Sequence, residues 1–164
     1  MSRIAHTLVT VLLAVIVATA AQAQIDSPPP PLQGQASFHL YSVPGVIQAG
    51  GLGTFFACTN TTGAAIRVGV EVFGPGGGAA ANDASATSLD VGPSATVLFG
   101  AGGAVGLSIS GSLGAGGLSK GSARILATAK KGIICGAFVA DDGNAPPTSM
   151  TTLMVIAKTK QRGD

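Results

Sequence analysis

The clearest pattern in the chain is an alternation of apolar and polar residues that begins near residue 38. In AIRVGVEVF (65–73), branched residues at positions 66, 68, 70 and 72 alternate with Arg67, Gly69 and Glu71. A period of two residues predicts a strand that buries one face. No stretch after residue 23 shows an apolar period of 3.6 residues bounded by helix caps, so we expect an all-β fold. The other expected strands lie at residues 37–43, 54–59, 87–91, 95–99, 105–110, 123–129, 133–140 and 152–158.

Turn residues separate these segments. Gly92-Pro93-Ser94 predicts a turn, and Lys130-Lys131-Gly132 predicts a short hairpin connection with glycine where a positive φ is needed. Residues 141–147 predict a longer loop, which its two prolines keep out of the sheet. The chain has 25 glycines, and 14 of them lie between residues 74 and 121, which predicts Gly-rich loops there. Many short strands with turns between them indicate a sandwich or a small barrel.

The two ends of the chain differ from this β-rich middle. Residues 1–23 have the parts of a secretory signal: a positive charge at Arg3, an apolar stretch of 14 residues, and small residues at the cleavage site. The alternative is a membrane-spanning helix, which needs about 20 apolar residues. We therefore expect a cleaved signal peptide (1–23), a Pro-rich spacer (24–37), a β-sandwich domain (38–158) and a polar C-terminal tail (159–164).

Composition and charge narrow the location and the partners. A cleaved signal predicts export to the periplasm or the extracellular space, and the Ala- and Gly-rich composition suggests a bacterial source. Without the signal, eight basic residues stand against seven acidic ones, a net charge of about +1. Such a small charge gives no electrostatic basis for binding nucleic acid. No segment after residue 23 is long and apolar enough to span a membrane.

The chain has two cysteines, Cys58 and Cys135. An even number of cysteines in an exported chain predicts a disulfide. The period of two places Cys58 on one face with Phe56, and Cys135 on one face with Ile133, so both sulfur atoms can point inward. The alternatives are a nucleophile, which needs an activating base nearby, and a metal site, which needs about four ligands.

The order of the cysteine strands resembles that of immunoglobulin-like sandwiches. In that fold a cysteine on the second strand meets one on the next-to-last strand, and the similar order here covers residues 38–158. The resemblance implies a two-sheet antiparallel sandwich with Gly-rich loops and one inter-sheet disulfide. Two features depart from the antibody pattern: the chain has no tryptophan, and Ile133 stands where that pattern has a tyrosine.

Few residues are candidates for chemistry. His39 is the one histidine after the predicted cleavage site, and an exported hydrolase would use it as its base, although no G-x-S-x-G elbow surrounds any serine. Asp141, Asp142 and Asn144 are weak candidates for a calcium site, which takes six to eight oxygen ligands. Asn60 begins a formal glycosylation motif, NTT. We expect no catalytic residue, no cofactor and no bound metal.

These observations predict an exported, non-catalytic β-sandwich whose specific role the sequence does not reveal. We expect a binding or structural module of the cell envelope or extracellular space, with an envelope component or a glycan as the partner. One alternative is the exported hydrolase that uses His39. The other is a pilus-like subunit that assembles by donating a strand to its neighbour, which needs an alternating apolar extension at the N-terminus.

Overall fold

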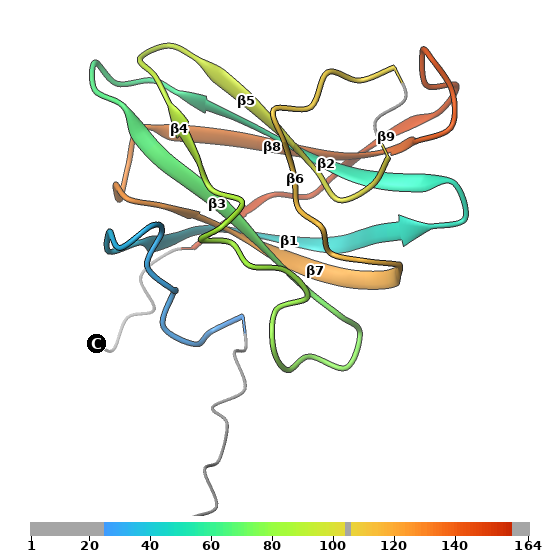
Figure 1. Cartoon of the computed structure of the whole chain (residues 1–164), viewed down its shortest axis with the longest axis horizontal. Helices are drawn as coiled ribbons and strands as arrows, with labels where there is room; N and C mark the ends of the chain where they lie inside the picture. The colour runs from blue at the N-terminus through green and yellow to red at the C-terminus, as the bar shows by residue number, and fades with distance from the viewer. Residues whose placement is uncertain (1–24, 104–105, 159–164) are drawn as a thin grey trace, which may run out of the picture.

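The computed structural model describes residues 25–103 and 106–158, and this part of the chain contains strands and no helix (Figure 1). The predicted signal peptide and C-terminal tail lie outside the described residues. The all-β prediction is confirmed. Within the two described ranges, no helix has the length and apolar character needed to cross a membrane. The strands are β1 (Phe38–Ala49), β2 (Leu52–Asn60), β3 (Ile66–Phe73), β4 (Leu89–Val91), β5 (Thr96–Gly100), β6 (Gly111–Ser112), β7 (Leu118–Ala127), β8 (Ile133–Asp141), β9 (Met150–Leu153) and β10 (Ile156–Ala157).

The strands form one sheet that is nearly closed into a barrel. One half has the order β4-β3-β7-β1, with β10 beside β1, and the other half has the order β9-β8-β2-β5-β6. The halves join where Gln48 and Ala49 of β1 pair with the start of β2. Figure 1 shows the two halves as layers that face each other. The β5–β6 pair is parallel, and the other strand pairs of the described chain are antiparallel.

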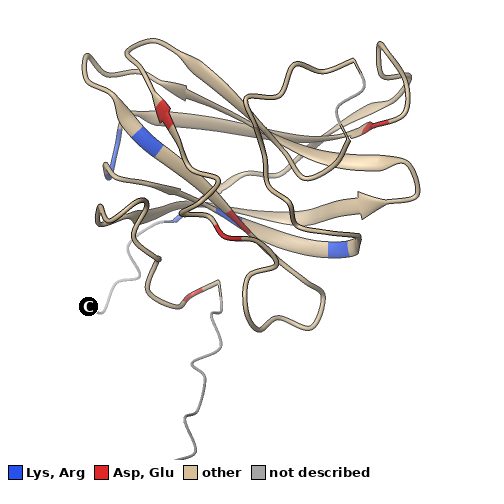
Figure 2. Cartoon of the chain, in the orientation of Figure 1, with Lys and Arg blue, Asp and Glu red and all other residues tan. Residues whose placement is uncertain are grey.

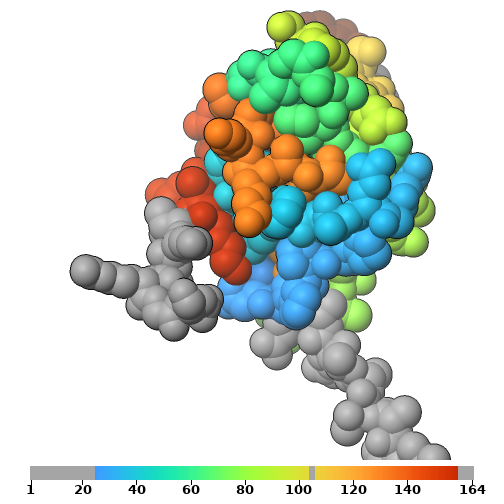
Figure 3. Space-filling model, turned by 90° about the vertical axis from the view of Figure 1, so that its left-hand side faces the viewer, coloured from blue at the N-terminus to red at the C-terminus, as the bar shows by residue number. Residues whose placement is uncertain are grey.

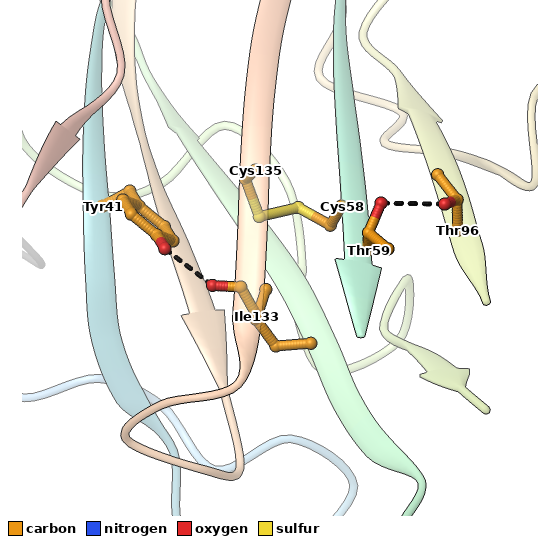
Figure 4. Close-up of a disulfide and its surroundings, with 6 residues drawn as sticks. All are labelled: Tyr41, Cys58, Thr59, Thr96, Ile133 and Cys135. Atoms are coloured by element: carbon orange, nitrogen blue, oxygen red, sulfur yellow. Dashed lines mark hydrogen bonds between the residues drawn. A yellow bond between two sulfur atoms is a disulfide. The ribbon is translucent and has the colours of Figure 1, made fainter. Parts of the chain in front are cut away.

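The sheet closes on one side through a segment that changes partner. Leu153 of β9 pairs with β8, and three residues later Ile156 of β10 pairs with β1. Beside this segment, the Tyr41 hydroxyl of β1 donates a 2.6 Å hydrogen bond to the carbonyl of Ile133 in β8 (Figure 4). A side chain thus joins the two halves where strand pairing does not.

The opposite seam depends on a close approach between β4 and β6. A Cβ atom on Gly111 of β6 would lie 3.2 Å from the side chain of Leu89 in β4. Such a distance is at the tight end of van der Waals contact, so glycine lets the two edges meet. Leu89 also packs on the core, which extends to this seam.

The core fills the space between the two halves. Val68, Val70 and Val72 of β3 have no exposed surface, as the alternation in that segment predicts. They pack with inward residues of β1, β2 and β7, such as Val43, Phe56 and Ile125. Burying a side chain of this size stabilises the fold by about 1.5–3 kcal/mol.

The first strand is longer than the sequence pattern predicts. β1 has 12 residues and continues past Pro44 and Gly45 to pair with β2. Its pairing with β7 is irregular between Pro44 and Val46, where a bulge absorbs the proline. This strand belongs to both halves of the sheet, so its length sets how the sheet curls.

Two predictions are wrong, one about a strand and one about a hairpin connection. The described part of the predicted strand 105–110 forms no strand; instead, Ile109 packs on Gly100 at the outer side of β5, and Gly106 turns with φ +82°. Residues 130–132 do not close a hairpin, because β7 pairs with β1 and β3 whereas β8 pairs with β2 and β9. Gly132 does have the expected positive φ, +88°, in a connection that leads from one half to the other.

The predicted disulfide is present between Cys58 and Cys135. Its predicted inter-sheet position is wrong, since the two cysteines lie directly opposite each other on the paired strands β2 and β8 (Figure 4). Periodicity correctly places both sulfur atoms toward the core, but it does not reveal which strands are neighbours. The resemblance to immunoglobulin-like sandwiches is therefore not confirmed.

Candidate functional site

The segment Ile25–Gln35, which has turns at residues 25–27 and 33–34, lies against the outer face of β3 and β7, and we call it the strap. Figure 1 shows it in blue along this half of the sheet. Its Leu32 has no exposed surface and packs with Ala84 and Leu126. Gly69 of β3 forms the floor of this socket, because a Cβ atom there would lie 2.9 Å from a Leu32 methyl carbon. The segment that the sequence predicted as a spacer is thus packed onto the domain.

A buried ion pair anchors the other end of the strap. Glu71 of β3 and Arg124 of β7 are opposite each other in the strand register, and the Arg124 Nε atom donates a hydrogen bond to the Glu71 carboxylate. Arg124 has no exposed surface, and its guanidinium lies 5.4 Å from the centroid of the Phe73 ring. Its Nη1 atom donates hydrogen bonds to the carbonyl oxygens of Ile25 (3.0 Å) and Ser27 (2.6 Å).

These contacts offset the cost of burying the charged guanidinium of Arg124. Burying a charged guanidinium is unfavourable unless an opposite charge and hydrogen-bond acceptors surround it. Glu71 supplies the charge, and the carbonyl groups of the strap supply acceptors. The strap is therefore part of the environment that makes Arg124 tolerable inside the protein.

Further contacts fix the rest of the strap. The backbone nitrogen of Gln33 donates a 2.9 Å hydrogen bond to the Ser85 hydroxyl, and the Ser37 hydroxyl donates a 2.6 Å bond to the carbonyl of Pro30. At the other end, Lys158 lies 3.5 Å from the carboxylate of Asp26. This exposed pair contributes little energy, but it places the end of the described chain beside the strap (Figure 3).

His39 lies on β1, near the same buried arginine. Its Nε2 atom is 3.1 Å from the carbonyl oxygen of Tyr41 and 3.0 Å from the Ser42 hydroxyl. A carbonyl oxygen can only accept, so the contact with Tyr41 places the hydrogen on Nε2, and that atom is not free to take a proton from Ser42. The Nδ1 atom is buried and has no hydrogen-bond partner among the described residues.

The electrostatic environment of His39 also opposes proton uptake. Burial, followed by the positive charges of Lys158 and Arg124, lowers the pKa of His39 from 6.5 to about 4. A general base at neutral pH works best with a pKa near 7 and with a carboxylate that orients its second nitrogen. The geometry of His39 provides neither feature.

Asp141 organises the loop that follows β8. One of its carboxylate oxygens accepts hydrogen bonds from the backbone of Gly143 and Asn144, and the other accepts bonds from the backbone and the hydroxyl of Thr148. These bonds hold the pKa of Asp141 well below its ordinary value, with the Thr148 hydroxyl as the largest cause. A calcium ion would have to displace these donors.

The other two predicted ligands also have hydrogen-bond partners within the protein. Asp142 accepts a 3.3 Å hydrogen bond from the backbone nitrogen of Gly103, and the amide nitrogen of Asn144 donates to Asp141. In the described ranges, no group of three or more His, Cys, Asp or Glu residues is arranged to hold a metal ion.

Asn60, which begins the glycosylation motif, is turned into the protein. It has no exposed surface, and its amide nitrogen donates hydrogen bonds to the carbonyls of Ala64 (2.7 Å) and Val91 (2.9 Å). Its amide oxygen accepts bonds from Thr62. Asn60 therefore braces the end of β2, and in the folded protein its amide is not presented to solvent.

An open hollow of ≈ 380 Å³ lies where the strap begins. Ile25 of the strap and Phe73 of β3 line it, together with Ser122 of β7 and the glycine-rich turn 74–78. Charged side chains concentrate on this half of the molecule: Figure 2 shows them on β3, β4 and β7, whereas β2 and β5 have none.

The pattern of apolar and polar residues does not identify the residues that hold the strap. Glu71 and Arg124 fall on the polar face of their strands, which the alternation predicts to be solvated. A usable signal was present: a single arginine stands within the small and apolar residues of 123–129, and an acid stands in the clearest strand. Their register could not be read from the pattern.

Comparisons with protein-family models, with curated proteins and with solved structures find no match to this chain. The Cys58–Cys135 disulfide is compatible with an oxidising, exported compartment. The function must therefore be argued from the geometry of the strap and of the candidate residues.

Proposed function

We propose that the chain is an exported, non-catalytic binding or structural module of the cell envelope or the extracellular space. The observation that carries this proposal is the occupation of its polar side chains by the chain itself. Arg124 binds carbonyl groups of the strap, and Asp141 binds the amides of its own loop. Such contacts stabilise a surface and prepare no group for reaction.

The same observation weighs against the hydrolase alternative. Nucleophilic catalysis by serine needs a histidine nitrogen that accepts the serine proton. In His39 the nitrogen that faces Ser42 also faces a carbonyl oxygen, and its pKa is lowered to about 4. This arrangement holds β1 in shape across its bulge between His39 and Tyr41.

The proposal is tested by assaying the oxidised, purified protein on ester, amide and glycan substrates beside the variant His39→Ala. We expect no turnover above background from either protein. Turnover by the wild type that His39→Ala abolishes would overturn the non-catalytic proposal. The intact mass of the protein, measured under oxidised and reduced conditions, tests the proposal that it is exported. We expect the mass to show loss of residues 1–23, and the oxidised form to be lighter than the reduced form by two hydrogens.

A further inference from the structure

The strap is bound to the sheet as a ligand is, and it is not built into the sheet as a strand. None of the described residues 25–35 pairs in a ladder with β1, β3 or β7, and the one bridge in this segment joins Leu32 to Gln35 of the strap itself. The side chain of Arg124 donates hydrogen bonds to the carbonyl oxygens of Ile25 and Ser27 in the strap. Docking of a proline-rich segment against side chains of a domain is one of the recurring modes of peptide recognition.

The first contact that holds the strap, the first anchor, binds main-chain carbonyl groups. The Nη1 atom of Arg124 binds the carbonyl oxygens of Ile25 and Ser27, which the turn at residues 25–27 brings close together. The guanidinium is held in place by Glu71 and by the Phe73 ring, so it is oriented before a peptide arrives. Because carbonyl groups are bound, this anchor accepts many side chains at those two positions.

The second anchor binds the side chain of Leu32. The socket made by Gly69, Ala84 and Leu126 encloses Leu32 completely. Between the anchors stand four prolines, residues 28–31, which favour a stiff extended conformation. A segment that is already extended loses little conformational entropy on binding, which favours recognition by a few contacts.

We propose that the outer face of β3 and β7 is a binding site for a proline-rich peptide that ends in leucine, and that the strap of a second copy of this chain supplies it. The strap occupies the site within one chain. The hollow that Ile25 lines lies next to the site. This inference rests on the proposed function of a binding module and names the class of its ligand.

Exchange between copies has a structural basis in the connection to β1. The residues that follow Leu32 are exposed, and Gln33 and Gly34 have positive φ values of 47° and 81° in a tight turn. Opening this turn would release the strap while the barrel keeps its own core. A strap released from one copy would fit the same site on another, which is segment exchange.

The test uses the full chain with a protease recognition sequence inserted between Gln35 and Ala36, which are both exposed. The protein folds intact, is cleaved, and is then titrated with a fluorescent synthetic peptide of residues 24–35. We expect the labelled peptide to replace the cleaved strap with saturable anisotropy, and a Leu32→Ser peptide to bind at least about tenfold more weakly, since a buried leucine contributes more than 1.4 kcal/mol.

Two protein variants link that binding to the first anchor. Glu71→Leu combined with Arg124→Leu removes the ion pair without leaving an unpaired buried charge, and we expect at least tenfold weaker peptide binding to a folded barrel. Lys120→Leu, which removes an exposed cation from the same strand β7, is the matched control and should bind the peptide as the parent does.

Exchange between copies is tested by refolding the uncleaved protein at about millimolar concentration, which matches the effective concentration of a short tether. We expect dimers in size-exclusion chromatography that are lost in Leu32→Ser. No saturable peptide binding, or unfolding of the barrel on cleavage, would overturn the peptide site. Monomers alone would overturn a second copy as its source. Neither result depends on turnover, so the proposed non-catalytic role stands or falls separately.

Discussion

Cys58 and Cys135 face each other across the paired strands β2 and β8, with their Cα atoms 4.2 Å apart (Figure 4). The two residues are separated by 77 positions in the chain, yet the sheet makes them immediate neighbours. The disulfide therefore fastens the pair of strands at the centre of one half of the sheet. Next to it, the hydroxyls of Thr59 and Thr96 join β2 to β5 by a 2.8 Å hydrogen bond.

Removal of this disulfide should destabilise the protein strongly. For a closed loop of 77 residues, the loop-closure model gives up to about 4.5 kcal/mol. We expect Cys58→Ala with Cys135→Ala to lower the free energy of unfolding by a large part of that amount in urea titrations. Thr59→Val, a change next to the bridge at a partly exposed position, should cost within about 1 kcal/mol. Equal stability of the double variant and the oxidised wild type would contradict this role.

Loss of Arg124 should destabilise the protein more than loss of the ion pair as a whole. Arg124→Leu leaves the Glu71 carboxylate buried without its partner, which typically costs about 3–5 kcal/mol. Replacing both residues by leucine should recover most of that loss. The matched control is Arg67→Leu: its partner Asp90 is well exposed, so no unpaired charge is left buried, and a smaller loss than for Arg124→Leu is expected. A double variant as unstable as Arg124→Leu alone would contradict the account.

An added methyl group at Gly69 should loosen the strap. The new Cβ atom would lie 2.9 Å from the Leu32 side chain and 3.0 Å from the carbonyl oxygen of Ala84, so overpacking should cost about 1–3 kcal/mol. We expect Gly69→Ala to make the strap more sensitive to limited proteolysis. Gly136→Ala, in β8, meets no atom within 4 Å and should leave proteolysis unchanged. Equal sensitivity of the two variants to proteolysis would contradict the role of the Leu32 socket in holding the strap.

The free energy of unfolding should decrease as the pH is lowered, because of His39. Its pKa is about 4 in the folded protein and about 6.5 in the unfolded chain, so between these values the unfolded chain binds a proton that the folded protein does not. Stability is therefore unaffected by His39 above about pH 6.5 and decreases as the pH falls from there toward 4. We expect His39→Gln to flatten this part of the curve, and NMR to give the pKa directly. An imidazole that titrates near 6.5 would contradict the burial argument.

The sequence predicted some features of this fold and missed others for identifiable reasons. Alternation placed the valines of β3 and both cysteines toward the core, since periodicity reports which face of a strand is buried. It did not reveal that the strands of the two cysteines, β2 and β8, pair with each other, because the partner of a strand depends on long-range topology. The continuation of β1 past Pro44 was missed because a proline reads as a break, and here a bulge accommodates it.

The candidate site was missed for a similar reason. Four consecutive prolines predict a segment that stays out of the sheet, and residues 28–31 do stay out of the ladder. What the pattern could not show is that Leu32 enters a socket and that Arg124 binds the carbonyls on the other side of the prolines. Both contacts join residues more than 35 positions apart in the chain.

The attachment of the strap to the sheet is tested most directly by NMR of the oxidised mature protein. We predict nuclear Overhauser contacts between the methyl groups of Leu32 and Leu126, and between Leu32 and the Cα protons of Gly69. Random-coil shifts for residues 25–35, without those contacts, would contradict it.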